Sequence, residues 1–335
     1  MVNERIKWLD VLKFIGIVEI VFGHLGLNNT MLGTFVWTHH VPLFFFAAGA
    51  VVSHEPVPFK ELFLKKSKTL LLPWIFFALL SITVYALLYN IGARQTLELL
   101  LIVVNGCIRN AFFAHSLWFL TCLFVICFVF ELLKRMKHNI LILLFCFILF
   151  LISELVLPIR PIVQPTMVWN LDSAMYYIIY YAIGYISFPY INKLLEKQNS
   201  RIVRSVYFFS EFLAILFCAA VFFGHNPLTK LRSNPFLDSI VTLITSLIII
   251  WALIFISYVF RNKKLLNIVG QNTLYICGNE FITKTMITSI LTSFGIQFSI
   301  TDPLVGLIYV FFILLIICKI LMPVEKAILD SIMHL

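Results

Sequence analysis

Apolar segments of roughly 20 residues, separated by short polar stretches, recur along the whole chain and constrain its fold more than any other feature. The hydrocarbon core of a bilayer needs about 20 apolar residues per spanning helix. Within lipid, backbone polar groups must be bonded inside one helix or around a closed barrel, and the alternating pattern of barrel strands is missing here. The sequence therefore predicts an all-α, polytopic membrane protein.

Composition excludes a soluble enzyme. Of the 335 residues, 61% are hydrophobic and 12% are charged, whereas soluble domains carry about 45–50% apolar and about 25% charged residues. The net charge of +9 is interpreted as a signal for membrane topology, so no nucleic acid is expected as a partner. The seven cysteines show no CxxC spacing, which favours roles in helix packing over disulfides or metal ligands.

The apolar runs predict a single bundle of about ten transmembrane helices, forming one membrane-embedded domain over residues 1–335. The stretch 97–104 is too short to cross a bilayer and is expected to be an interfacial helix. The predicted spans are 11–27, 36–52, 69–89, 112–133, 139–157, 172–191, 204–223, 239–260, 268–291 and 304–322.

Lys and Arg are distributed unevenly between the two sides of these spans. With the N-terminus inside, the inner segments hold 18 of the 25 Lys and Arg residues, and the outer loops hold five. Because positive residues concentrate in cytoplasmic loops, both termini are expected to be cytoplasmic. We expect a multi-pass protein of the plasma membrane, the bacterial cytoplasmic membrane.

The first span carries three polar side chains on one stripe. At about 100° per residue, Lys13 and His24 return to nearly the same helix face, and Asp10 lies close to it. Ionisable groups inside spans are costly and usually line a cavity or pathway. The stripe could form a passage with a cation at its cytoplasmic mouth and a proton acceptor above. Alternatively, Asp10 and Lys13 are interfacial anchors and His24 bonds a neighbouring helix.

Basic residues mark the cytoplasmic entry to the third span. Lys65 and Lys68 stand three residues apart, with Lys66 between them. These cations could hold the phosphates of an acyl donor, or they could anchor the chain to anionic lipid.

Polar and aromatic residues gather on the outer side. Arg109, His115 and Trp118 combine a cation, an imidazole and an aromatic ring, which suits a sugar but also an interfacial aromatic belt. His39 and His40 open the second span and could contact substrate or the interface. As neighbours they do not share a helix face, so no metal site is expected.

Glu280 is the last candidate. It lies four residues before Lys284 inside the ninth span, so the two could simply pair with each other.

These segments, in this order, resemble the acyltransferase-3 family of membrane O-acyltransferases, and within it the branch of fucose 4-O-acetylase-like proteins. The resemblance covers nearly the whole chain. The matching segments are Asp10-x-x-Lys13-(x)10-His24, the second-span run Val41 to Gly49, the Lys65-Lys66-x-Lys68 entry that leads to Pro73, Leu117-Trp118-Phe119-Leu120, and Gly270-x-Asn272-Thr273-Leu274-Tyr275.

The resemblance implies an acyltransferase that transfers groups other than aminoacyl groups. An acyl group, usually acetyl, would pass from cytoplasmic acetyl-CoA to a hydroxyl of a cell-surface or lipid-linked polysaccharide. His24 would be the essential histidine, acting as general base or transient acyl carrier. Lys13 would take the place of an arginine common in relatives, and it or nearby donors would orient the thioester or offset developing oxyanion charge. Asp10 and Glu280 are the other expected catalytic residues. Lys65, Lys66 and Lys68 would handle the donor. Glu280 departs from the family, because many relatives carry histidine there.

Other functions stay open at this point. A secondary transporter of a small or lipid-linked solute could use Glu19, Glu211 and Glu280 as coupling sites, although no half-to-half repeat is visible. A non-catalytic glycan-binding subunit is a third possibility. Membrane lipids, acyl-CoA and the glycan acceptor are the expected partners, and the chain could form a homodimer.

Overall fold

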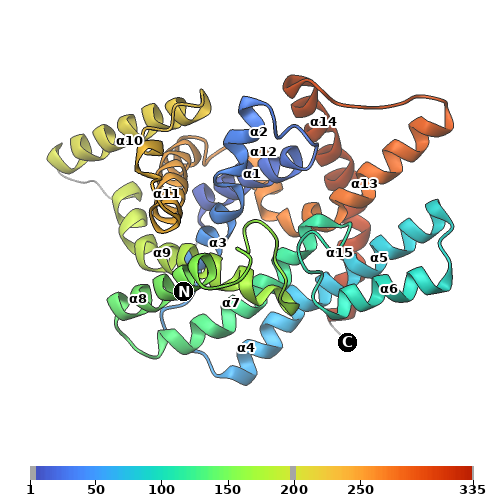
Figure 1. Ribbon diagram of the computed structural model, residues 1–335, viewed down its shortest axis with the longest axis horizontal. Coiled ribbons are helices and arrows are strands. Elements are labelled where there is room, and N and C mark those ends of the chain that lie inside the picture. Colours follow the sequence, from blue (N-terminus) through green and yellow to red (C-terminus); the bar gives the residue numbers. More distant parts are fainter. Residues whose placement is uncertain (1–4, 197–200, 334–335) are drawn as a thin grey trace. The chain divides into compact units, whose positions relative to one another are not determined.

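The computed structural model describes residues 5–196 and 201–333, and within them the regular structure is entirely helical (Figure 1). This confirms the all-α prediction. The helices are α1 (Lys7–Gly23), α2 (Met31–Trp37), α3 (His40–Ala50), α4 (Phe59–Lys66), α5 (Leu72–Tyr89), α6 (Ala93–Val104), α7 (Trp118–Lys134), α8 (Asn139–Leu155), α9 (Leu171–Glu196), α10 (Arg201–Phe222), α11 (Pro235–Val259), α12 (Lys264–Gln271), α13 (Thr273–Ser293), α14 (Pro303–Ile316) and α15 (Met322–Met333).

Six helical segments of the described residues are long and apolar enough to cross a membrane. The chain is thus a polytopic membrane protein, while the expected number of ten spans and the cytoplasmic placement of both termini stay predictions. The six segments are Met31–Ala50, Phe59–Tyr89, His115–Lys134, Ser205–Phe222, Pro235–Val259 and Pro303–Ile332.

Two predicted spans are broken and two are extended. The span 36–52 divides into α2 and α3 at Thr38 and His39. The span 268–291 divides at Asn272, whose side-chain amide donates to the Ile268 carbonyl oxygen at 2.7 Å and thereby competes with helical bonding. The helices beginning at Phe59 and Pro303 instead run on through wide π-helical turns, at Ser67–Leu71 and Ile317–Leu321. Apolar periodicity could not reveal these features. The breaks fall at polar runs of about three residues inside otherwise apolar spans, and the extensions run into charged stretches beyond the apolar ones.

The chain forms two compact units. Unit 1 comprises Met1–Val52, Tyr180–Thr273 and Ile300–Leu307, and unit 2 comprises Ser53–Ile179, Leu274–Ser299 and Ile308–Leu335. Helices α9 and α14 each contain residues of both units. The sequence predicts that the whole chain forms one domain. That the two units assemble into one domain stays a prediction.

Unit 1 is built around α1, which packs on α3, α11 and α12; Figure 1 shows α12 directly beside α1. The contact with α12 is made through backbone. A Cβ atom built on Gly270 would lie 1.8 Å from the Asp10 carbonyl oxygen, so a side chain larger than hydrogen cannot fit. Helices α3 and α9 meet in the same way, with Gly49 against the Tyr181 carbonyl and Gly184 against the Phe46 carbonyl. Small residues permit such close helix contacts in membranes.

Unit 2 has an aromatic core between α5 and its neighbours. Trp74 and Phe77 are buried with Phe112 and Leu117, and Gly278 of α13 lies against the Phe77 ring. Helix α5 ends at Asn90, which has φ 49° and reverses the chain so that α6 packs back on α5. The stretch 97–104 is helical as expected, within α6, and its interfacial position stays a prediction.

Replacing Gly270 with Ser should destabilise the protein by about 1–3 kcal/mol, since the added atoms would overlap the α1 backbone at Asp10. Thermal unfolding in detergent measures the effect. The matched control is Gly92→Ser at the N-cap of α6, where a Cβ meets no atom within 4 Å and serine is a favoured N-cap. Equal unfolding temperatures for the two variants would contradict the close α1–α12 contact.

Candidate functional site

Asp10 joins the first turns of α1 to α12 through its carboxylate. Its Oδ2 accepts from Arg5 Nε at 2.8 Å and from Gln271 Nε2 at 3.2 Å, and its Oδ1 lies 3.0 Å from Lys13 Nζ. The Asp10 side chain is 6% exposed and the Lys13 side chain is 27% exposed. Asp10 is therefore a buried, fully occupied acceptor, whereas the Lys13 ammonium is held in place and can still meet a ligand. The sequence stripe missed Gln271, because only the tertiary fold brings it to Asp10.

His24 follows the last residue of α1 and caps the helix, with its backbone N–H donating to the Ile20 carbonyl at 3.2 Å. Its ring meets the edge of the Trp37 indole at 6.5 Å between centroids. Trp37 is fixed by a 2.5 Å hydrogen bond from its indole N–H to Asn28 Oδ1. Along α1, Lys13 and His24 are about 16 Å apart at 1.5 Å rise per residue. The predicted stripe thus spans the length of the helix, with an ammonium at one end and an imidazole at the other.

His39 and His40 lie inside unit 1, 0% and 3% exposed. His40 Nδ1 contacts the Val36 carbonyl at 2.8 Å, and its ring meets Trp37. His39 Nε2 lies 3.0 Å from Glu19 Oε1, a pair that sequence reasoning missed although both residues lie within apolar spans. The break between α2 and α3 turns both imidazoles back toward α2 carbonyls. Their role in substrate binding stays a prediction.

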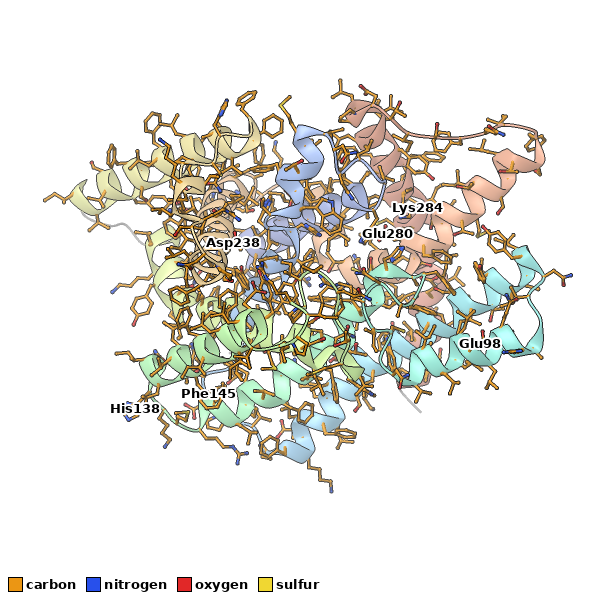
Figure 2. All side chains as sticks on the ribbon, in the orientation of Figure 1. Glu98, His138, Phe145, Asp238, Glu280 and Lys284 are labelled. Atoms are coloured by element: carbon orange, nitrogen blue, oxygen red, sulfur yellow. The ribbon has the colours of Figure 1, made fainter. Side chains whose placement is uncertain are left out.

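Unit 2 holds a second polar site around Glu280 of α13. Glu280 is 2% exposed, and its two oxygens accept from Lys284 Nζ and Ser116 Oγ, each at 2.7 Å. Figure 2 shows Glu280 and Lys284 together on this helix. The pairing of Glu280 with Lys284 is confirmed. Ser116 was missed, because a serine beside His115 carries no signal of its own in the sequence.

A small cavity adjoins the Glu280 carboxylate. It has a volume of about 10 Å³ and is lined by His115, Ser116, Cys277, Phe281 and Lys284, among others. A cavity of this size holds about one water molecule and no sugar. The arrangement can position a proton or a water, and His115 is exposed at its margin.

Arg109 and Trp118, predicted as substrate contacts, come together in unit 2. The Arg109 guanidinium lies 5.1 Å from the centre of the Trp118 ring and also donates to the Pro161 carbonyl. The centres of the Trp118 and Tyr177 rings lie 5.7 Å apart. Trp118 is 6% exposed, so in this arrangement the indole supports the loop at Arg109 and presents little surface to a ligand. A direct sugar contact by either residue stays a prediction.

The three lysines before the third predicted span lie where α4 passes into its π-helical turn. Lys65 and Lys68 are exposed, and Lys66 is partly buried. The π-helical turn ends at Leu71, two residues before Pro73. Proline lacks a backbone N–H, and both proline and π-turns interrupt the regular hydrogen bonding of a helix. The lysines thus form an exposed cationic group on unit 2.

Comparison with known proteins gives one match. Residues 6–322 match a family model described as an acyltransferase domain. No protein of curated function and no solved structure matches the chain.

Replacing Lys284 with Met should destabilise unit 2 by about 3–5 kcal/mol, because it leaves the buried Glu280 carboxylate without its cation. The double variant Glu280→Gln/Lys284→Met should recover most of this loss. Chemical or thermal unfolding in detergent provides the measurement.

The control is another i,i+4 pair, Arg94 with Glu98, whose side chains are 92% and 59% exposed. Arg94→Met should change the unfolding free energy by less than about 0.5 kcal/mol. A Lys284→Met effect no larger than this would contradict a buried ion pair at Glu280.

Proposed function

The chain belongs to the acyltransferase-3 family and is a membrane acyltransferase, and from this premise we propose that it is an O-acetyltransferase. The proposed donor is cytoplasmic acetyl-CoA, and the proposed acceptor is a hydroxyl of a cell-surface or lipid-linked polysaccharide. The proposed location is the bacterial plasma membrane, with both termini cytoplasmic. The observation that supports this function best is the position of His24 at the end of α1.

His24 is the most accessible of three imidazoles on the first segment of unit 1. It is partly exposed, whereas His39 and His40 are buried and bonded to backbone carbonyls. A substrate can therefore reach the His24 ring. Imidazole is also the side chain whose unperturbed pKa lies nearest neutral pH, as general base catalysis requires.

The proposed reaction uses the His24 ring as proton acceptor. Imidazole takes the proton of the acceptor hydroxyl while the hydroxyl oxygen attacks the thioester carbonyl. The C–S bond breaks, and the proton then neutralises the departing thiolate. In the alternative route, the imidazole nitrogen attacks the thioester carbonyl, the C–S bond breaks and CoA leaves as its thiolate. The acceptor hydroxyl then attacks the acetyl-imidazole, the C–N bond breaks, and the hydroxyl proton neutralises the thiolate. In both routes a ring nitrogen of His24 takes up a group, either the hydroxyl proton or the acetyl group.

Lys13 is proposed to act on the donor rather than at the acetyl group. A separation of about 16 Å along α1 keeps its ammonium away from a carbonyl bound at His24. The long pantetheine arm of CoA likewise separates its phosphates from the thioester, so the two ends of α1 suit the two ends of the donor. Asp10 is a positioning residue in this proposal, since it holds the Lys13 ammonium at 3.0 Å.

Unit 2 supplies the other proposed roles. Lys65, Lys66 and Lys68 are proposed to bind the phosphates of acetyl-CoA as point charges. Glu280 stands where many relatives carry histidine, and the Ser116 hydroxyl and the Lys284 ammonium fix its carboxylate there. Arg109, His115 and Trp118, with His39 and His40 in unit 1, are proposed to shape acceptor binding, the buried ones indirectly.

His24→Ala should lower acetyl transfer by at least about 100-fold, because the reaction loses its base or acyl carrier. Mass spectrometry of surface glycans from cells expressing each variant measures transfer, with protein amounts compared by immunoblot. His225→Ala is the control, since His225 lies exposed in a loop. Glycans that keep their acetyl groups in His24→Ala cells would overturn the mechanism.

Replacing Lys65 and Lys68 together with Gln should raise the KM for acetyl-CoA about 3- to 10-fold with little change in kcat, because exposed charges contribute modestly to binding. Thiol release by the purified enzyme reports both constants. Lys60→Gln, an exposed position earlier on α4, serves as the control. An unchanged KM would assign the lysines to contacts with membrane lipid.

A further inference from the structure

Some ionisable side chains of unit 1 take no part in the chemical steps of the proposed acyl transfer. Among them are Glu19 of α1, His39 at the start of α3 and Glu211 of α10. His39 and Glu211 are 0% and 1% exposed, and the Glu19 side chain is 13% exposed. A charge is costly in such surroundings, so the structure should show which of these groups carry a proton.

The surroundings of His39 fix the proton on one of its nitrogens. Nδ1 lies 3.1 Å from the Phe35 carbonyl oxygen, which can only accept. The Thr38 hydroxyl lies 3.2 Å away and itself donates to that carbonyl at 2.6 Å, so it too accepts from Nδ1. Nδ1 therefore carries a hydrogen in either charge state of the ring.

The contact between His39 and Glu19 then requires a further proton. With Nδ1 protonated, a hydrogen bond at 3.0 Å between Nε2 and Glu19 Oε1 needs one hydrogen between the two atoms. The pair is either an imidazolium with a carboxylate or a neutral imidazole with a carboxylic acid. Both descriptions contain one shared proton and a net charge of zero, which suits a buried position.

Glu211 lies in similar surroundings without a cation. Both of its oxygens are buried, and the polar group that faces them is the Tyr207 hydroxyl, one turn earlier on α10. The Tyr207 ring packs against Trp251 and Phe255, so the environment of this face of α10 is otherwise aromatic. A hydroxyl brings no positive charge, and a buried carboxylate without a cation is costly, which favours a neutral carboxyl group there.

The two carboxyl groups lie on helices that both pack against α2, because α2 contacts α1 and α10. Phe35 connects the same elements, contacting His39 on one side and Phe222 of α10 on the other. The other titratable groups on the packed elements include His40 on α3, Tyr207 and Cys218 on α10, and Asp238 and Tyr258 on α11, while Lys7, Asp10 and Lys13 lie in the first two turns of α1.

We propose that unit 1 binds protons within the membrane at two places, the Glu19–His39 pair and Glu211. In the neutral state each place holds one exchangeable proton, which Glu19 and His39 share in the first case and Glu211 carries alone in the second. The ligand is the proton itself. These groups carry out no chemical step of the proposed acetyl transfer, and their protonation would give the activity of unit 1 a dependence on pH.

Dicyclohexylcarbodiimide tests the proton on Glu211, because this apolar reagent adds to carboxylic acids. The acid proton moves to one reagent nitrogen, the carboxyl oxygen bonds to the central carbon, and rearrangement gives a stable N-acylurea with no leaving group. Full-length protein in liposomes is treated near neutral pH and mapped by peptide mass spectrometry. Glu211 should be labelled more than about tenfold above Glu98, whose side chain is exposed to water and paired with Arg94.

Two variants complete the labelling test. Glu211→Gln should remove the adduct, and Glu211→Asp should keep it because a carboxylic acid remains at that place. Glu280 provides an internal control, since it is a buried carboxyl group with a lysine at 2.7 Å, and it should be labelled less than Glu211. Labelling of Glu211 no greater than that of Glu98 in folded protein would overturn the proposal for Glu211.

The shared proton is tested by solid-state NMR of protein labelled with 15N-histidine in liposomes. Subtracting the spectrum of His39→Gln isolates the two His39 nitrogens. Nδ1 should remain protonated at every pH at which the protein is folded. A bare Nδ1 with a protonated Nε2 would overturn the assignment. Neither measurement uses acyl transfer, so a failure here is distinct from a failure of the proposed function.

Discussion

The backbone contact between Gly270 and Asp10 determines how the first helix of unit 1 is held. In lipid, apolar side chains gain little by leaving one hydrocarbon environment for another, so close packing and polar contacts must join the helices. The contact supplies both, because the glycine admits the α1 backbone and the adjacent Gln271 reaches the Asp10 carboxylate. Asp10 in turn orients Lys13. A structural contact and a proposed donor contact therefore depend on the same turn of helix.

Polar side chains inside the units are used in two ways. Most are bonded to fixed partners, such as Glu280 with Ser116 and Lys284, and these contacts lock local structure. His24 differs because it follows the end of a helix, is partly exposed and contacts a tryptophan edge. The proposed reaction requires the His24 ring to change partners, and at the helix end such a change breaks no backbone bond of α1.

The sequence predicts the helical membrane class, the family and the pairing of Glu280 with Lys284, because each depends on composition or on neighbours along one helix. The breaks at Thr38 and Asn272 could not be predicted, since the polar runs there are only about three residues long and long apolar segments continue on either side. Contacts from distant segments were also hidden. Gln271 at Asp10 and Ser116 at Glu280 join residues more than 160 positions apart, and no local spacing encodes them.

The two units alternate along the chain, and this has a consequence for biosynthesis. Unit 1 includes the first 52 residues, yet its last segment is Ile300–Leu307. A ribosome must therefore release most of the polypeptide before the environment of α1 is complete. Until then, the carboxylates and imidazoles of the early helices lie beside the translocon or within lipid, without all of their final contacts. A chain that terminates before Ile300 leaves both units incomplete and would be a substrate for quality-control proteases.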